Sequence, residues 1–337
     1  MFTTLAQRYL PALDDTMRRV VDRVTEPEDF AVMLRYPLGW VDSAGAPYSH
    51  STGKRIRPIL LLLSAEAAGG EWQQALPAAA AVELLHNFSL IHDDIQDRSP
   101  TRHGRPTVWV VWGEANAINA GDAIFTLAYC ALESLSGSGL RDSTLLEAWR
   151  IFNATTLELT RGQHLDMRFE KQVSVATDEY LSMISGKSAA LVAGSAQIGA
   201  LLGSQNVEVA AHIAEFGLNL GIAFQIRDDI LGIWGDPNVT GKSAATDILS
   251  RKKSLPVLHA LSRSAELAEI YQREPFGEAD VPDAIHALDA ASALDYAQER
   301  EAHYYQQALA ALKRADLRGS AAEGLLELTE WLFRRDH

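Results

Sequence analysis

Apolar residues return every three or four positions along most of this chain of 337 residues. That spacing is typical of helices, and no convincing run of alternating β-branched residues indicates a strand. The pattern predicts an amphipathic helix over residues 1–24 and, from its glycines and prolines, a loop over residues 39–52. Pro58 is well placed to open a leucine-rich helix that runs to Gly69. We therefore expect an all-α protein.

Further helices are predicted downstream over residues 116–135 and 142–169. Residues 188–207 carry no charge, but their Ala, Gly and Ser content suits a helix buried in a protein core better than one facing lipid. Residues 1–24 contain acidic side chains and no continuous apolar run. We therefore expect neither a signal peptide nor a membrane span.

Three carboxylates end an apolar segment over residues 84–97. If this segment is helical, Asp93 and Asp97 share one face and Asp94 lies beside them, with no basic residue among the three. Neighbouring like charges on a helix repel, and they repel more strongly where water is partly excluded. A cation is expected here, and hard oxygen ligands without thiols favour Mg2+.

A second acidic group, Asp228 and Asp229, lies far downstream at the end of another apolar helical pattern. A solvated helix end is the alternative for either group alone. Two such groups on separate apolar helices can face each other only across the interior of a bundle. Magnesium prefers a few carboxylates together with substrate phosphate oxygens, so the pair predicts a diphosphate held by metal ions in a central cavity.

The composition limits the partners and the cellular compartment that we expect for this protein. The net charge of −14 and the pI near 5.1 argue against nucleic acid, whose binding needs clustered Lys and Arg. The single cysteine, Cys130, allows no internal disulfide, which fits a reducing cytosol, so we expect a cytoplasmic protein. With 47% hydrophobic residues and no linker, residues 1–337 are expected to form one domain.

The first acidic group has the form Asp-Asp-x-x-Asp, and the second repeats it in part. The chain resembles the trans-isoprenyl diphosphate synthases of the polyprenyl synthetase family, which carry two such motifs. The second motif keeps the family's Phe-Gln, as Phe224 and the substrate-binding Gln225, but Gly232 replaces the third aspartate. The resemblance covers roughly residues 50–260 and implies a single large helical bundle of the isoprenoid synthase fold and a homodimer. The metal ligands that it implies are Asp93, Asp94, Asp97, Asp228 and Asp229.

The basic residues Lys54, Arg55 and Arg57 form a dense cluster where the loop meets the next helix. A helix N-terminus favours an anion, although a basic triplet alone is more often a solvated surface. Residues 53–58 match the family's Gly-Lys-Arg-x-Arg-Pro motif. The resemblance makes Lys54 and Arg57 ligands of isopentenyl diphosphate, with His86 as a further contact to the same phosphate.

A pair of family arginines is matched only in part. Arg102 matches the first, which implies a ligand of the allylic diphosphate, and His103 replaces the second, which binds isopentenyl diphosphate. Because histidine is charged only when its pKa is raised, binding through His103 is expected to be weaker and more pH-dependent. Arg105 is a candidate to compensate.

Further basic and amide residues match the family downstream. Gln163 and Asp166 are implied to support the metal site, and Lys187 is implied to bind the allylic diphosphate. Lys187 also adjoins the long uncharged run, where an unpaired lysine would be costly, and this independently favours an anionic partner. Lys242 and Lys252 match lysines that close over the diphosphate, in a stretch that we expect to be a loop.

The expected reaction is an ionisation followed by a condensation. Metal ions and basic residues neutralise the allylic diphosphate as it leaves, and the double bond of isopentenyl diphosphate attacks the allylic cation. Asp93, Asp94, Asp97, Arg102, Lys187, Asp228 and Lys242 form the catalytic set.

Two residues on the first acidic helix are expected to set the product length. Ser89 shares a face with Asp93 and leaves the wall of the pocket open, whereas Phe88 is bulky and sits to the side. In the family this combination indicates the twenty-carbon geranylgeranyl diphosphate, with farnesyl or a somewhat longer diphosphate as alternatives. Two other classes stay open: a terpene cyclase-like enzyme, and a regulatory subunit that Gly232 would fit.

Overall fold

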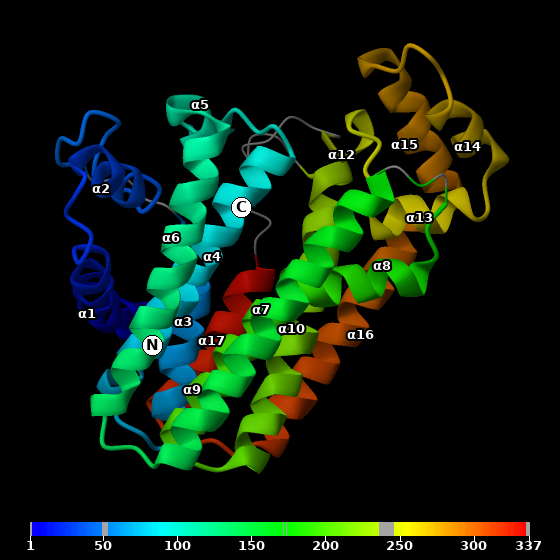
Figure 1. The fold of residues 1–337 in the computed structure, drawn as a ribbon. Helices are drawn as coiled ribbons and strands as arrows, with labels where there is room; N and C mark the ends of the chain where they lie inside the picture. Colours follow the sequence, from blue (N-terminus) through cyan, green and yellow to red (C-terminus); the bar gives the residue numbers. More distant parts are fainter. Residues whose placement is uncertain (1, 49–52, 171, 173, 236–245, 335–337) are drawn as a thin grey trace. The chain divides into compact units, whose positions relative to one another are not determined.

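The computed structural model describes residues 2–48, 53–170, 172, 174–235 and 246–334, and this part of the chain is almost entirely helical (Figure 1). The prediction of an all-α protein is confirmed. The exception among named elements is a small antiparallel ribbon, in which β1 (Thr101–Arg102) pairs with β2 (Arg105–Pro106). The chain divides into two compact units, so the expected single domain over residues 1–337 stays a prediction.

The first unit contains Met1–Thr156, Gly194–Ile213 and Leu317–Leu325. Figure 1 shows helices α1, α3, α4 and α6 side by side in it, and these helices contact one another. These helices pack against one another through their apolar faces, as the spacing predicted. The main helices of this unit are α1 (Phe2–Val21), α2 (Glu28–Arg35), α3 (Ile56–Ala67), α4 (Leu76–Gln96), α5 (Val108–Trp112) and α6 (Glu114–Glu133).

Small side chains hold α4 and α6 close together. Ala78 and Ala79 of α4 are fully buried, as are Ala117 and Ala120 of α6. A Cβ atom on Gly121 would lie 2.3 Å from His92 Nε2, so only glycine lets the His92 ring lie against α6 at this point. This close packing fixes the direction of α4, which carries the first acidic group at its end.

Four long helices contribute residues to both units: α7 (Asp142–Glu170), α9 (Ala190–Ser204), α10 (Val207–Trp234) and α17 (Ser320–Phe333). Among the described residues, α10 is long and apolar enough to cross a membrane by length and composition. Half of its most apolar window is buried inside the protein, and the core helix of a soluble protein passes the same test. A single helix of this kind is weak evidence for a membrane span.

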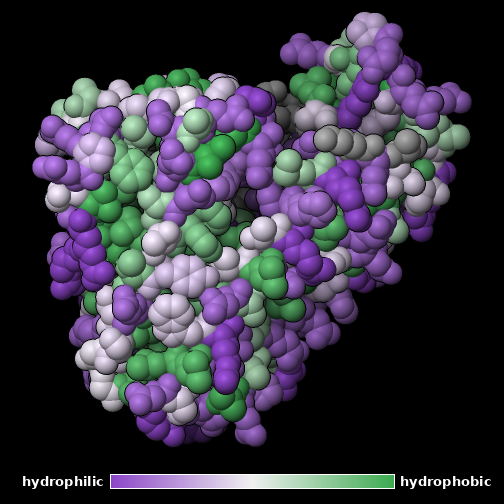
Figure 2. Space-filling model, in the orientation of Figure 1, coloured by the Kyte–Doolittle hydropathy of each residue, from purple (hydrophilic) through white to green (hydrophobic). Residues whose placement is uncertain are grey.

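The second unit contains Leu157–Ala193, Ala214–Asp316 and Leu326–His337. One apolar cluster joins residues of α7, α8, α10 and α13, including Tyr180, Ile226 and Leu255. A second cluster joins the end of α10, at Ile233, to Ile248. Figure 2 shows that the visible surface over α14 and α15 is mostly hydrophilic. The remaining helices of this unit are α8 (Thr177–Ile184), α12 (Thr246–Leu249), α13 (Leu255–Leu261), α14 (Ala265–Tyr271), α15 (Val281–Ala290) and α16 (Ala293–Arg314).

Candidate active site

The basic loop leads into the N-terminus of α3. Lys54 is exposed and Arg57 is partly buried, and Arg57 Nη1 lies 3.2 Å from Nε2 of His86 on α4. The structure therefore brings together two of the three residues implied for isopentenyl diphosphate. The N-terminus of α3 adds unsatisfied backbone N–H groups and a favourable dipole for an anion.

His86 is neutral in this arrangement. Burial, followed by the positive charge of Arg57, holds the pKa of His86 well below its usual value of 6.5. Because a guanidinium can only donate, Nε2 of His86 accepts the hydrogen bond from Arg57. Glu83, one turn earlier on α4, is 4% exposed, and burial raises its pKa more than the charges of Arg55 and Arg57 lower it.

The first acidic group closes the C-terminal end of α4. Asp94 is 5% exposed, and its Oδ1 accepts hydrogen bonds from Arg102, with 2.8 Å to Nε. The same guanidinium reaches Asp93 Oδ2 at 3.4 Å, while Asp97 is exposed. Burial raises the pKa of Asp94, and Arg102 offsets only part of this effect. Asp94 thus holds Arg102 beside Asp93.

A tight turn carries Arg102 and His103. His103 and Gly104 both have positive φ, 51° and 76°, which is the geometry of a two-residue type I′ hairpin between β1 and β2. A Cβ atom on Gly53 would lie 3.9 Å from His103 Nε2, so His103 lies beside the basic loop.

Arg105 is held by contacts within the protein. Its Nη1 and Nη2 donate to the backbone oxygens of Tyr36 and Val41, and its guanidinium lies 4.0 Å from the centre of the Tyr36 ring. The guanidinium is therefore engaged in fastening the segment after α2. Arg105 lines the same pocket as Arg102 and His103, and its compensation for His103 stays a prediction.

In the second unit, Asp229 is almost completely enclosed. It is 1% exposed, and it accepts hydrogen bonds from the Tyr180 hydroxyl, Gln225 Nε2 at 3.2 Å and the Leu255 amide at 3.1 Å. Burial raises its pKa, and Lys252 leads the groups that oppose this shift. Its neighbour Asp228 is exposed. The predicted metal role of Asp229 stays a prediction, but its oxygens are already engaged by the protein.

Lys187 is not the unpaired lysine that the sequence suggested. A Cβ atom on Gly162 would lie 2.0 Å from the Lys187 backbone nitrogen, so α7 touches the π-helical turn Ser185–Ala189 directly. This contact lets Lys187 Nζ pair with Asp166 of α7. The argument for an anion from an unpaired charge is therefore wrong, although Lys187 remains beside Ser188, which donates to Gln225 at 2.6 Å.

A third carboxylate reaches the end of α10 from a different helix. A Cβ atom on Gly232 would lie 2.6 Å from Asp247 Oδ2, so the Asp247 carboxylate fills the space beside the residue that replaces the usual aspartate. Lys252 Nζ lies 3.6 Å from Asp247 and 3.8 Å from Asp229. Burial lowers the pKa of Lys252, but the nearby carboxylates, Asp229 first, outweigh it and raise the pKa to about 12. Lys242 lies outside the described residues.

The donor set suits magnesium better than a metal that needs a complete protein cage. Among the described residues, no three His, Cys, Asp or Glu side chains gather closely enough to enclose an ion. Magnesium does not require such a cage, because it keeps waters and binds one or two carboxylates together with substrate phosphates. Asp97 and Asp228 are exposed and Asp93 is partly buried beside Arg102, and these three carboxylates offer oxygens of this kind.

Phe88 points into an aromatic stack. Its ring lies 4.7 Å from the ring of His92 on α4 and 4.7 Å from Phe125 on α6, and Tyr129 continues the series. Ser89 donates its hydroxyl back to the His86 carbonyl at 2.7 Å and adds little volume. The assignment of these two residues to product length stays a prediction, with Phe125 as a neighbour that the sequence had not indicated.

Comparison with known proteins identifies the class. The model of the polyprenyl synthetase family matches residues 39–288. The geranylgeranyl diphosphate synthase of Mycobacterium tuberculosis is 40% identical over 98% of this chain and 93% of its own length. A (2E,6E)-farnesyl diphosphate synthase of the same organism is 44% identical over 75% of this chain and 70% of its own length. The polyprenyl synthetase of Streptomyces coelicolor A3(2) superposes with a TM-score of 0.90 at 34% identity, covering 98% of this chain and 99% of its own.

The chain therefore belongs to the polyprenyl synthetase family. It is an isoprenyl diphosphate synthase, a prenyltransferase of the short-chain trans type.

Proposed function

We propose that this enzyme uses Mg2+ to condense isopentenyl diphosphate with an allylic diphosphate and that its main product is geranylgeranyl diphosphate. The observation that carries the proposal is the pairing, within one unit, of Arg57 with His86 and of Arg102 with the first acidic group. A cyclase that ionises one diphosphate has no use for a second anion site. The Arg57 and His86 pair therefore favours a two-substrate reaction.

The first unit is proposed to bind both substrates. Lys54, Arg57 and His86 hold isopentenyl diphosphate at the N-terminus of α3, where backbone amides assist. His103 lies beside this loop and adds a donor. Arg102, which Asp94 holds in place, donates to the allylic diphosphate. The fixed guanidinium loses less freedom on binding than a mobile one would.

The second unit is proposed to complete the neutralisation of the leaving diphosphate. Lys187, from the π-helical turn Ser185–Ala189, and Gln225, from α10, contribute donors, and Lys187 is paired with Asp166 of α7. Lys252 stays charged throughout the physiological range because its pKa is about 12. Lys242 is proposed to act with it. Asp228 is proposed to act on the same diphosphate as Asp93 and Asp97.

Divalent metal ions supply charge neutralisation and orientation for the departing diphosphate when they are bound. The protein's part is to stabilise charge where it develops, through the arginine and lysine donors above. The proton lost after the condensation can pass to the diphosphate that has just left. No serine, cysteine or histidine nucleophile is needed for this chemistry.

Product length is proposed to depend on Phe88. The small Ser89 leaves one side of α4 open, while Phe88 is held by Phe125 and can stop the growing chain. Farnesyl diphosphate is the second candidate, because a farnesyl diphosphate synthase has the higher identity, 44%, over the part that it matches. Replacing Phe88 with Ala should lengthen the product, and the Phe125 ring would then be the next side chain to limit it. An unchanged product would remove Phe88 from the floor of the pocket.

The test is an incubation of purified protein with Mg2+, labelled isopentenyl diphosphate and dimethylallyl, geranyl or farnesyl diphosphate in turn, followed by separation of products by chain length. A twenty-carbon product supports the whole proposal. A fifteen-carbon product keeps the reaction and changes the product to farnesyl diphosphate. If folded protein incorporates no label with any primer, the proposed reaction is wrong.

A further inference from the structure

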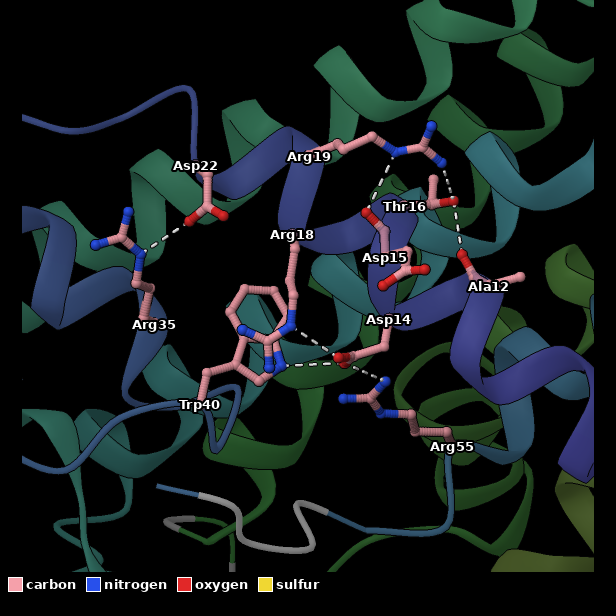
Figure 3. A network of polar contacts seen from close by, with 10 residues as sticks. All are labelled: Ala12, Asp14, Asp15, Thr16, Arg18, Arg19, Asp22, Arg35, Trp40 and Arg55. Carbon is pink, nitrogen blue, oxygen red and sulfur yellow. Dashed lines mark hydrogen bonds and ion pairs between the residues drawn. The ribbon is translucent and has the colours of Figure 1, made fainter. Parts of the chain in front are cut away.

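Arg55 is the member of the basic cluster to which no substrate contact has been assigned. It precedes α3 directly and has a left-handed backbone, with φ of 47°. Its side chain is 14% exposed, and its Nη1 donates to Asp14 Oδ1 of α1 at 3.1 Å (Figure 3). Lys54, one residue earlier, is exposed. Adjacent residues of one short loop therefore differ sharply: one is presented outward and the other is fastened to a helix.

Asp14 is itself fixed from three sides. Figure 3 shows the guanidinium of Arg18, the indole of Trp40 and the guanidinium of Arg55 converging on its carboxylate. Arg18 Nε donates to Oδ2 at 2.9 Å and Trp40 Nε1 donates to Oδ1 at 3.0 Å. Arg18 also lies over the Trp40 ring, 4.4 Å from its centre. An acceptor held in this way gives Arg55 one defined position.

The carboxylate of Asp14 stays charged under ordinary conditions. Burial alone would raise its pKa, but hydrogen bonds and charge from Arg18 and Arg55 outweigh burial, and the pKa is lowered. The bond to Arg55 is therefore a charge-assisted one, which is stronger than a neutral hydrogen bond.

The loop is tied on its other side as well. Arg57 reaches Nε2 of His86 on α4, and the charges of Arg55 and Arg57 both act on the buried Glu83. Left-handed backbone at a non-glycine residue is strained, and it persists where surrounding contacts enforce it. Asp14 supplies such a contact for Arg55, across 41 residues of sequence.

We propose that Asp14 is a positioning residue for isopentenyl diphosphate: by holding Arg55 against α1, it fixes the loop so that Lys54 and Arg57 meet the substrate. This inference rests on the proposed function. It assigns Arg55, the first arginine of the motif, a role inside the protein, while Lys54 and Arg57 face the ligand. The expected signature is a loss of affinity for one of the two substrates, with the chemical step unchanged.

The experiment compares Asp14→Asn with Asp15→Asn, a matched change at the next position of α1. Asp15 is exposed and its backbone oxygen accepts from Arg19, so it takes no part in holding Arg55 (Figure 3). For Asp14→Asn we expect the KM for isopentenyl diphosphate to rise on the order of tenfold. The kcat and the KM for the allylic substrate should stay near their original values, as should all three constants in Asp15→Asn.

Arg55→Gln tests the same contact from its other end and keeps the inference falsifiable if Asp14→Asn folds poorly. It should reproduce the rise in KM, and the double variant should add little, because both changes remove one interaction. Calorimetric titration with isopentenyl diphosphate alone should give the same loss of affinity. An unchanged KM in folded Asp14→Asn or Arg55→Gln would overturn the inference, as would equal losses for both substrates. If the original protein consumes no isopentenyl diphosphate, the proposed function fails instead.

Discussion

The two acidic groups look alike in sequence but are built differently. In each pair the second aspartate is buried, Asp94 at 5% exposure and Asp229 at 1%. Asp94 is held by one charged partner, Arg102, whereas Asp229 is held mainly by neutral donors from Tyr180, Gln225 and a backbone amide. The two residues of each Asp-Asp pair therefore have different roles. Its first residue is the more accessible to solvent, and its second organises the protein around it.

The groups also obtain their third carboxylate differently. In the first group Asp97 is the residue directly after α4, at the C-cap of the helix. In the second group position 232 is glycine, and Asp247 of α12 enters the space beside it. A motif departure that suggests a weakened site is thus accompanied by a carboxylate from elsewhere in the chain. This lessens the case for a regulatory subunit, which rested on Gly232.

The largest expected effect comes from the more accessible aspartate of the first pair, Asp93. Asp93→Asn should lower kcat about a thousandfold. This factor corresponds to a loss of about 4 kcal/mol of the charge stabilisation that bound metal gives to the departing diphosphate. Steady-state kinetics at saturating substrates and Mg2+ measure it. Asp283→Asn, at an exposed position of α15, is the control and should retain full activity. A loss below tenfold in Asp93→Asn would mean that this carboxylate is dispensable.

The buried aspartate of the second group should matter for stability. Tyr180→Phe removes a hydroxyl donor from a carboxylate that water barely reaches, so we expect the free energy of unfolding to fall by about 2 kcal/mol. Urea denaturation measures this change. Tyr129→Phe is the control, because the Tyr129 hydroxyl donates to Asn153 at an exposed position. Equal stability losses in the two variants would contradict the special role of Asp229.

A fall in pH from 7 to 5.5 should lower the free energy of unfolding through His86 in the first unit, and not through Lys252 in the second. The pKa of His86 is depressed in the folded protein, so the unfolded chain takes up this proton first as the pH falls. Folded stability from this group is therefore lost below about pH 6.5, by up to about 1.4 kcal/mol per pH unit. Lys252, with a pKa of about 12, contributes no change in this range. His86→Gln should flatten the loss of stability between pH 7 and 5.5, and an unchanged slope in this variant would contradict the role given to His86.

The smallest effect is expected at Asp247, the carboxylate that α12 places beside Gly232. Asp247→Asn removes one of two partners of Lys252, which is partly exposed, so kcat/KM should fall about two- to fivefold. Gly232→Ala should act in the same direction, because its Cβ atom would displace the carboxylate. If both variants keep the original kcat/KM, Asp247 fills space without taking part in binding.

The spacing of apolar residues was sufficient to predict most of the long helices, and short motifs were sufficient to locate both acidic groups. The helices predicted over residues 116–135 and 142–169 correspond closely to α6 and α7. The apolar segment singled out over residues 84–97 covers only the later part of α4, which begins at Leu76 with an alanine run that lacks amphipathic contrast. Helix α12 was also missed, since four residues within a polar stretch give no periodic signal.

Long-range partners could not be read from the sequence. Lys187 meets Asp166 only because Gly162 lets two backbones touch, and Arg55 meets Asp14 across 41 residues. Asp247 lies beside Gly232 because buried Ile248 packs in one cluster with Ile233. Each of these pairings depends on tertiary packing, which spacing along the chain does not encode.

The central proposal is that the two acidic groups act on one metal-bound diphosphate. A double-mutant cycle of Asp93→Asn and Asp228→Asn tests it, with Mg2+-dependent affinity for an unreactive allylic thiolodiphosphate measured by calorimetry. Each single change should weaken binding by roughly tenfold or more. Because both carboxylates serve the same ligand, the double variant should lose at least about 1 kcal/mol less than the sum of the single losses. Losses that simply add would mean that the two groups act independently, and the account would be wrong.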